Sequence, residues 1–466
     1  MTAKDDALQF LEAHYSRWVE LAKDLWEHPE LGLQETRSSK LLADELERAG
    51  FSVQRGVDQL PTAFVASWGE GKPIIGILGE YDALPGLSQK VSAVREPVEE
   101  GAPGHGCGHN LFGVGCLAAA LAVKEAMEKA GIKGTVRYYG CPAEETMVGK
   151  PFMARAGVFD DLDAAITWHP FYVNSVWWSS FLAMNSFKVN FHGVAAHAAA
   201  APHEGRSALD AVLLMDIGVN FMREHMPEKA RIHCVITKGG QAPNVVPAYA
   251  QVWYYVRAPI REQVEEIYAH MLDIAKGAAL MTGTTYDVDF LTGGYDMLPN
   301  DTLCELLLEK LKEAGPPQFT PEEKEFARQL QATLPPNAIE DALRSYGLSR
   351  EQVGDPLCEV IVEPYDKGRV LPASTDVGDV SHITPTAQIT TCCHALGTPL
   401  HSWQNTAFAG SSIGFKGMMV AARTLALATL DLLTKPDLVK AIREEFEKKR
   451  AGKQYVSPLP EGAVPH

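Results

Sequence analysis

Three apolar segments of strand length each run directly into side chains that can ligate a metal or move a proton. Residues 74–79 lead into Glu80-Tyr-Asp82, residues 135–140 into Pro-Ala-Glu144-Glu145, and residues 163–168 into His169. Helical patterns separate these segments, and strands alternating with helices predict an α/β fold with a mainly parallel sheet. Because the carboxyl ends of parallel strands share one edge of a sheet, we expect these side chains to converge there.

A second pattern begins after residue 180. Strands are predicted at residues 182–192, 231–237, 250–257 and 285–291, and helices at residues 206–226 and 261–281. This β-α-β-β-α-β order is ferredoxin-like and fits an inserted α+β domain with a core of its own. We therefore divide the chain into a first domain, residues 1–180 and 295–466, and an inserted domain, residues 181–294.

Helical spacing of apolar residues predicts three further helices in the first domain, at residues 5–28, 111–130 and 416–434. Residues 315–350 are rich in proline and charge, and they are predicted to form an excursion with short helices rather than sheet.

Charge and cysteine content narrow the functional classes. The formal net charge of −17 argues against nucleic acid and anionic membrane as partners. No uninterrupted apolar run approaches the roughly 20 residues of a membrane span, and the N-terminus has no signal-peptide core. The eight cysteines include several in apolar surroundings, as expected of reduced thiols, so we expect a cytoplasmic protein.

The segment His105-Gly-Cys107-Gly-His109 carries the strongest chemical signal. Thiolate and imidazole ligands suit zinc, manganese or cobalt. In an extended segment, Cys107 and His109 would point to the same side and His105 to the other. A Cys-x-His pair also occurs often by chance, so this segment needs support from elsewhere in the chain.

That support comes from Glu144, Glu145, His169 and His401. Two adjacent carboxylates on an extended segment diverge, so one can ligate a metal while the other faces a substrate water. A solvated acidic pair is the alternative for the glutamates, and a buried core histidine is the alternative for His169. His401, in Pro399-Leu-His-Ser, is a weak signal by itself.

Four further residues are candidates for supporting roles. Asp82 follows a buried strand and can orient a ligand histidine, although a turn-capping aspartate fits equally. His197 lies in a loop of small residues, where it can approach a bound substrate. Asn244 lies in a turn-rich loop and can hydrogen-bond a carbonyl or carboxylate. Arg257 ends a predicted strand and can pair with a carboxylate bidentately, or form a structural ion pair.

Taken in order, these motifs resemble those of the di-metal aminoacylase and carboxypeptidase superfamily. The likeness rests on Glu-Tyr-Asp-Ala-Leu-Pro, His-Gly-Cys-Gly-His-Asn, Pro-Ala-Glu-Glu, Trp-His-Pro, Ala-His-Ala-Ala-x-Pro, Pro-Asn-Val-Val-Pro and Leu-His-Ser. Within the superfamily the chain is similar to the hydrolases of N-acyl amino acids. Two segments look closest to the p-aminobenzoyl-glutamate hydrolase B-subunit group and its dipeptidase relatives. They are Gly-Glu-Tyr-Asp-Ala-Leu-Pro-Gly-Leu-Ser-Gln and Gly-Arg-Ser-Ala-Leu-Asp-Ala.

The resemblance implies a role for each candidate residue. It implies two divalent ions, zinc or manganese, with the ligands Cys107, His109, Glu145, His169 and His401. Glu144 would be the general base, and Asp82 would orient a ligand. His197 would reach across a dimer interface to stabilise the oxyanion in the neighbouring subunit, and Asn244 would hold the substrate carboxylate or the oxyanion.

The resemblance also implies an activity. The chain would be a metal-dependent amidohydrolase or metallopeptidase acting on linear amides such as N-acyl or N-aroyl amino acids. The inserted domain would serve for dimerisation, giving a homodimer or a heteromer with a related subunit. A dipeptidase for unusual dipeptides and a non-catalytic partner of a related hydrolase are the alternatives. One departure stands out: Asn110 occupies a position where related acyl-amino-acid hydrolases usually have Asp.

Overall fold

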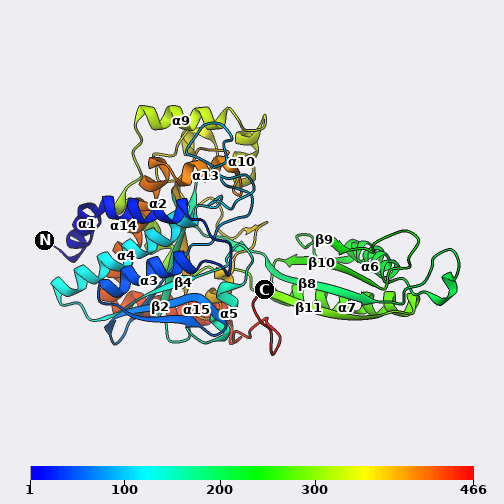
Figure 1. Ribbon diagram of the computed structural model, residues 1–466. Helices are drawn as coiled ribbons and strands as arrows, with labels where there is room; N and C mark the ends of the chain where they lie inside the picture. The colour runs from blue at the N-terminus through cyan, green and yellow to red at the C-terminus, as the bar shows by residue number, and fades with distance from the viewer. Residues whose placement is uncertain (1) are drawn as a thin grey trace. The chain divides into compact units, whose positions relative to one another are not determined.

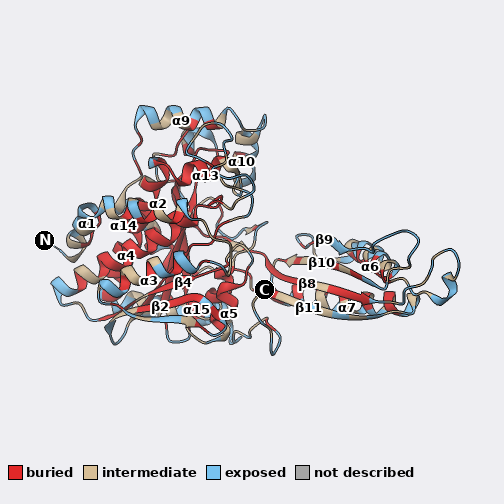
Figure 2. Ribbon diagram, viewed as in Figure 1, coloured by how far each residue is buried: buried red, intermediate tan, exposed pale blue. Residues whose placement is uncertain are grey.

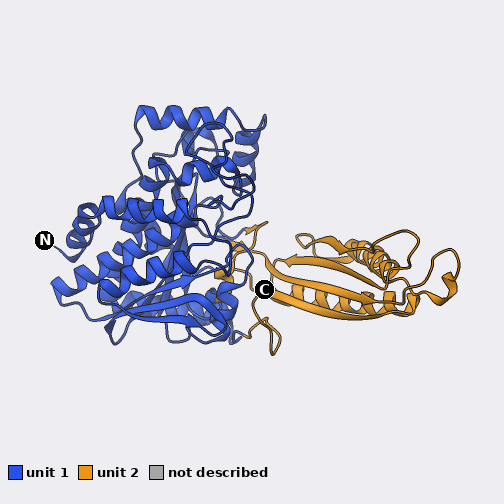
Figure 3. Ribbon diagram, viewed as in Figure 1, with its two compact units in different colours: residues 1–179, 298–369, 380–455 blue, residues 180–297, 370–379, 456–466 orange. Residues whose placement is uncertain are grey.

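The computed structural model describes residues 2–466, and the chain divides into two compact units (Figure 3). Unit 1 comprises residues 1–179, 298–369 and 380–455, and unit 2 comprises residues 180–297, 370–379 and 456–466. Two short later segments group with the inserted segment in unit 2. Strand pairing explains the first of them, because Val370–Leu371 (β12) pairs in parallel with Ser180–Phe181 (β7).

Unit 1 is built on a seven-stranded sheet in the order β1-β2-β4-β3-β5-β13-β6. Strands β2 and β4 of this sheet are labelled in Figure 1. The four central strands β4, β3, β5 and β13 are parallel, and the outer pairings are antiparallel. The expected mainly parallel sheet is therefore confirmed for its central block. The strands are β1 (Ser52–Val57), β2 (Leu60–Glu70), β3 (Ile74–Glu80), β4 (Gly134–Cys141), β5 (Ala164–Phe171), β6 (Ser175–Trp177) and β13 (Thr386–Cys392).

Two long apolar helices, α4 (His109–Ala130) and α14 (Ser412–Thr434), pack against each other and form the centre of the core. Both are long and apolar enough to cross a membrane by composition, yet 89% of each apolar window is buried inside the protein, as in the core helices of soluble folds (Figure 2). Glycines allow α4 to lie close to the sheet. A Cβ at Gly113 would lie 2.7 Å from the Glu80 carbonyl oxygen, and one at Gly115 would lie 2.9 Å from the Trp168 ring. The first turn of α4 is thereby held at the carboxyl end of β3.

The remaining helices surround this core. The single helix predicted at residues 5–28 is two helices in the structure, because the helix is interrupted at His14. Their bounds are α1 (Ala3–Ala13), α2 (Tyr15–Glu27), α3 (Thr36–Arg48), α5 (Gly149–Arg155), α8 (Asp301–Ala314), α9 (Pro321–Gln331), α10 (Ala338–Tyr346), α11 (Arg350–Val353), α12 (Val377–Ser381), α13 (Trp403–Ala409) and α15 (Pro436–Arg450).

The excursion forms short helices, α9 to α11, as predicted, and it packs on the segment that precedes His401. Gln331 donates a hydrogen bond of 2.9 Å from Nε2 to the Leu396 carbonyl. The Leu396 N–H also donates to the carbonyl of Pro356, just after the excursion, at 3.0 Å. The excursion therefore braces one of the predicted metal-binding loops.

Unit 2 has the expected ferredoxin-like order, with a four-stranded antiparallel sheet arranged β11-β8-β10-β9. Helices α6 and α7 cover one face and bury a core of its own. Strand β9, at one edge of the sheet, is largely exposed. The elements are β8 (Ala183–His192), η1 (Pro202–Glu204), α6 (Ala208–Met222), η2 (Arg223–His225), β9 (Arg231–Lys238), β10 (Tyr249–Ala258), α7 (Arg261–Thr282) and β11 (Thr285–Gly294).

Candidate metal centre and active site

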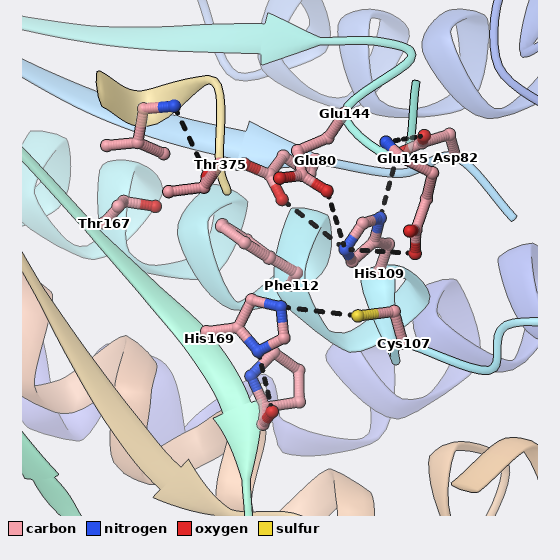
Figure 4. Close-up of polar contacts among 12 residues, drawn as sticks. Glu80, Asp82, Cys107, His109, Phe112, Glu144, Glu145, Thr167, His169 and Thr375 are labelled. Carbon is pink, nitrogen blue, oxygen red and sulfur yellow. Dashed lines mark hydrogen bonds and ion pairs between the residues drawn. The ribbon is translucent and has the colours of Figure 1, made fainter. Parts of the chain in front are cut away.

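The predicted residues of unit 1 meet at the carboxyl ends of the parallel strands, and Figure 4 shows all of them except His401. Asp82 follows β3, Glu144 and Glu145 follow β4, and His169 lies near the end of β5. The loop before α4 contributes Cys107, with His109 as the first helical residue, and His401 comes from the loop after β13. The convergence expected from strand ends is therefore present in the structure.

Cys107 and His109 reach the cluster by a different route from the one predicted. The segment is not extended, because Gly108 adopts a left-handed conformation with φ of 78° and starts α4. This turn, rather than strand alternation, brings Cys107 Sγ to 3.4 Å from Nε2 of His169. His105 points away, as expected, with Nε2 lying 3.1 Å from the Leu25 carbonyl oxygen.

Asp82 supports the metal centre through two hydrogen bonds. Its Oδ1 accepts a hydrogen bond of 2.9 Å from Nδ1 of His109, and its Oδ2 accepts one of 2.9 Å from the Glu145 backbone N–H. The first bond places the proton of His109 on Nδ1 and leaves Nε2 facing the cluster. Asp82 is buried and holds both a ligand candidate and the turn that carries another.

Glu144 and Glu145 lie on a tight turn rather than on an extended segment. Ala143 has a left-handed φ of 52°, and the Met147 N–H donates to the Glu144 carbonyl at 2.7 Å. Both carboxylates point toward His109, whose Nε2 is 4.0 Å from Glu144 Oε2 and 4.0 Å from Glu145 Oε1. The turn therefore directs both side chains into the site, where the extended segment would have made them diverge.

The two remaining histidines are oriented by the backbone. Nδ1 of His169 donates to the Pro170 carbonyl at 2.8 Å, so its Nε2 faces Cys107. His401 has a left-handed φ of 59°, and its N–H donates to the Gly106 carbonyl at 2.9 Å. Its Nε2 lies 3.1 Å from Glu145 Oε2.

These side chains form two triads of potential metal ligands that share one sulfur. Cys107, His109 and His169 form the first, and Cys107, Glu145 and His401 form the second, with ligand atoms within 4.8 Å of one another in each. His109 Nε2 and Glu145 Oε1 are buried with no hydrogen-bond partner among residues 2–466. Buried polar atoms of this kind need a partner, and a divalent cation satisfies both, so the donor set fits a metal.

The electrostatics of the cluster favour a cation. Burial alone would raise the pKa of the Cys107 thiol, but positive charge on His169 and His109 brings that pKa well below its ordinary value of 9.0. Burial would lower the pKa of His109, but the charges of Cys107 and Asp82 raise it well above 6.5. Hydrogen bonds with Cys107 and Glu145 raise the pKa of His401 to about 10. Negative charge concentrated in this way attracts metal ions and protons alike.

Glu80, at the end of β3, also belongs to the site, although no individual role was predicted for it. Its Oε2 lies 3.5 Å from His109 Nε2, and with His109 and Glu144 it forms a third group of potential ligands. Its other oxygen accepts a bond of 2.6 Å from the fully buried Lys150. The available signal was strand alternation, which sets Glu80 and Asp82 on the same side of the chain.

Asn110 does not contact the cluster. Its buried Nδ2 donates to the carbonyls of Ala22 at 3.1 Å and Ala409 at 3.0 Å, joining α4 to α2 and to the end of α13. An aspartate carboxylate here would face two carbonyl oxygens. The asparagine therefore has a packing explanation in this chain.

The loops of His197 and Asn244 lie side by side in unit 2. The Ala198 N–H donates to the Asn244 carbonyl at 3.0 Å, and the Val246 N–H donates to the Ala196 carbonyl at 3.0 Å. Nδ1 of His197 accepts from the N–H groups of Ala199 and Ala200, which leaves Nε2 as the proton-bearing, outward nitrogen. Both side chains are exposed.

Arg257 lies on β10, half-buried, with its guanidinium 5.0 Å from the ring centre of Tyr255. Burial lowers its pKa. No carboxylate among residues 2–466 lies within ion-pair distance of it, so the structural ion pair weighed from the sequence is absent. Its role in binding a substrate carboxylate stays a prediction.

A buried thiolate, imidazole and carboxylate cluster with a spare glutamate, at the carboxyl edge of a parallel sheet, defines a metal-dependent hydrolase. Known proteins with similar sequences include a hydrolase and a dipeptidase, in agreement with this class. Residues 183–280 match the peptidase dimerisation domain. The chain is 45% identical to the B subunit of p-aminobenzoyl-glutamate hydrolase from Escherichia coli K12, over 99% of this chain and 98% of that protein. It is 31% identical to human Xaa-Arg dipeptidase, over 94% of this chain and 90% of that protein.

Solved structures share the fold. An aminobenzoyl-glutamate utilization protein from Klebsiella pneumoniae matches with a TM-score of 0.61 at 18% identity, covering 92% of this chain and 98% of that chain. The Bacillus subtilis YXEP protein, described as a dinuclear metal binding peptidase from the M20 family, matches with a TM-score of 0.56 at 20% identity, covering 90% of this chain and 99% of that chain. The chain belongs to the M20 family, in its branch of metal-dependent amidohydrolases.

Proposed function

We propose that the chain hydrolyses the amide bond of an N-acyl or N-aroyl amino acid, with p-aminobenzoyl-glutamate-like compounds as the substrate class. The observation that carries the proposal is Glu144, a carboxylate 4.0 Å from His109 that belongs to neither of the two triads sharing Cys107. A purely structural metal site needs only its ligands, whereas hydrolysis also needs a base beside the metal. The relative with 45% identity supports the substrate class.

The two triads would hold two divalent ions, zinc or manganese. Cys107, His109 and His169 suit one ion, and Cys107, Glu145 and His401 suit the other. When bound, divalent ions polarise an amide carbonyl and lower the pKa of a water at the site. Cys107 is the one residue common to both triads, so its thiolate would be available to either ion.

The protein's own part in the reaction is proton transfer and orientation. Glu144 would take a proton from the attacking water and deliver it to the leaving amine, as a positioned carboxylate can do in both directions. Asp82 would keep Nε2 of His109 directed at the centre through the bond to Nδ1. Burial of the cluster keeps bulk water away and strengthens these interactions.

Unit 2 would supply the groups that recognise the substrate. His197 presents a proton on Nε2, which suits it to stabilise a developing oxyanion in a neighbouring subunit. Asn244 and Arg257 would bind the carboxylate of the amino-acid part, and the half-buried guanidinium of Arg257 has no carboxylate of its own among residues 2–466.

The partners would be a second copy of this chain or a related subunit. The edge strand β9 exposes Val235 by 53%, and α6 exposes Ile217 by 50% and Phe221 by 67%. Unpaired edge strands and apolar helix faces are typical of subunit interfaces. Light scattering with wild type and with a Phe221→Glu, Ile217→Glu double variant tests this: the variant is expected to be monomeric, and an unchanged mass would contradict an interface there.

We also propose that the protein is cytoplasmic. All eight cysteines are free thiols, as expected in a reducing compartment.

A dipeptidase is the second candidate, favoured by the human Xaa-Arg dipeptidase likeness. The decisive experiment measures amino-acid release by the purified protein from N-aroyl-glutamates, indoleacyl-amino acids, β-alanyl dipeptides and Xaa-Arg dipeptides, with added zinc or manganese. Release from aroyl-glutamates that a chelator and Glu144→Gln both abolish supports the proposal. Preferential release from dipeptides overturns the substrate class, and no release with metal bound favours a non-catalytic partner of a related hydrolase.

A further inference from the structure

The segment before α3 lies between two loops of the metal centre. The Ala83 N–H, next to Asp82, donates to the Glu30 carbonyl at 2.8 Å. On the other side, a Cβ at Gly32 would lie 3.1 Å from the Cα of Ala143, so the two backbones are in close contact. The segment therefore contacts both the Asp82 loop and the glutamate-bearing turn.

Two glutamates near the start of α3 have different hydrogen-bonding partners. The Glu30 carboxylate accepts from the N–H of Arg37 at 3.0 Å and the N–H of Ser38 at 2.8 Å, which caps the helix. Glu35 occupies the N-cap position but makes no side-chain cap bond. Because Glu30 has taken that role, the side chain of Glu35 is free to extend inward.

Glu35 extends to the turn that carries the general base. Its side chain is fully buried, and Oε1 accepts a hydrogen bond of 2.8 Å from the Ala143 N–H. Oε2 accepts one of 3.1 Å from Oγ1 of Thr62. Burying a carboxyl group is costly unless it is hydrogen-bonded, and both oxygens of Glu35 have a partner here. The residue that Glu35 holds in this way, Ala143, lies immediately before Glu144.

Ala143 is where the turn needs support. Its left-handed φ of 52° is disfavoured for a residue with a Cβ. This conformation turns the chain after β4 so that Glu144 and Glu145 both face the cluster. Asp82 holds the other end of the same turn through the Glu145 N–H at 2.9 Å. The turn is thus held at both ends by buried carboxyl groups.

We propose that Glu35 is a positioning residue for the hydrolytic reaction, holding the Ala143 turn so that Glu144 and Glu145 keep their places at the metal centre. This rests on the proposed function for its catalytic consequence. Its consequence for metal binding through Glu145 can be measured without any substrate.

Three variants test the proposal. Glu35→Ala leaves the Ala143 N–H buried without its acceptor, and we expect kcat and affinity for the metal at the Glu145 triad to fall by roughly 10–100-fold, with KM little changed. Glu35→Gln keeps an acceptor for Ala143, and the Thr62 hydroxyl can accept from its amide, so it should restore both quantities. Glu30→Gln is the matched control, which weakens the α3 cap and lowers Tm without touching the turn.

The readouts are Tm, kcat and KM, and zinc stoichiometry measured by competition with a chromophoric chelator on the full-length protein. Binding of one zinc ion weakened by roughly 10–100-fold in Glu35→Ala, its recovery in Glu35→Gln and wild-type zinc affinity in Glu30→Gln would support the proposal. Wild-type zinc binding and kcat in folded Glu35→Ala would overturn it, and so would an equal zinc loss in Glu30→Gln. If Glu35→Ala does not fold, Glu35→Asp, which shortens the side chain, replaces it under the same criteria. Failure of the proposed substrate class would leave the zinc result intact.

Discussion

Asp82 accepts a hydrogen bond of 2.9 Å from Nδ1 of His109 while both side chains are fully buried. The bond fixes which ring nitrogen of His109 faces the metal centre. In Asp82→Asn, the amide N–H group would either face the Glu145 N–H, which loses that bond, or donate to His109 Nδ1, which moves the ring proton onto the Nε2 that faces the cluster. We expect kcat/KM and zinc affinity to fall roughly 10–100-fold. Zinc competition and steady-state kinetics measure both, and unchanged zinc affinity would contradict the orienting role.

Substitutions of Glu144 and of Glu145 should have different effects on catalysis and on zinc binding. Glu144→Gln removes the proton acceptor but no member of the two triads, so kcat should fall on the order of 10²–10⁴-fold with zinc content retained. Glu145→Gln should instead lose zinc, because Glu145 belongs to the triad with His401. Metal analysis of both variants beside their kinetics decides the roles, and zinc loss in Glu144→Gln would reverse the assignment.

Metal affinity should rise with pH. The pKa of His401 is raised to about 10 and that of His109 lies well above 6.5, so both hold protons at neutral pH when no ion competes. An ion must displace those protons, and affinity is therefore lost as pH falls. Calorimetric zinc titrations in buffers of different ionisation enthalpy should show net proton release. Affinity independent of pH between 6 and 8 would show that the ligands carry no displaceable protons.

Asn110 should not tolerate aspartate. Its amide donates to two main-chain carbonyls, and a buried carboxylate in its place would face both oxygens. We expect Asn110→Asp to lower the free energy of unfolding by about 3 kcal/mol, as for other uncompensated buried charges. Asn337→Asp, at an exposed position, is the matched control and should change little. Equal stability of the two variants, measured by urea denaturation, would rule out this packing role.

Strand ends explain why the sequence predicted so much of the site. A carboxylate or histidine directly after an apolar strand has its place set by local pattern, which is why Asp82, Glu145 and His169 could be expected to converge. The conformations of Gly108 and Ala143 could not be read in the same way. They are left-handed turns held by contacts with distant parts of the chain.

Glu35 shows most clearly which contacts the sequence pattern could not predict. In Gln34-Glu35-Thr36-Arg37 it looks like a solvated charge at the start of a helix, and its burial depends on an N–H 108 residues further along the chain. Glu80 and Lys150 are similar, because a buried ion pair joins them across separate elements. Such partners are set by tertiary packing, which local periodicity does not encode.

Glu35 should also give stability a pH dependence that a glutamine removes. Burial, and then the charge of Asp82, raise its pKa from 4.5 to about 8. Between these values the folded state holds a proton that the unfolded state releases, so this group makes the protein less stable as pH rises through that window. Glu35→Gln does not titrate and mimics the protonated form. The difference in unfolding free energy between variant and wild type should therefore increase in the variant's favour from pH 5.5 to pH 8.5. Urea denaturation at both pH values measures it, and parallel stability curves would show that Glu35 titrates as an ordinary solvated carboxylate.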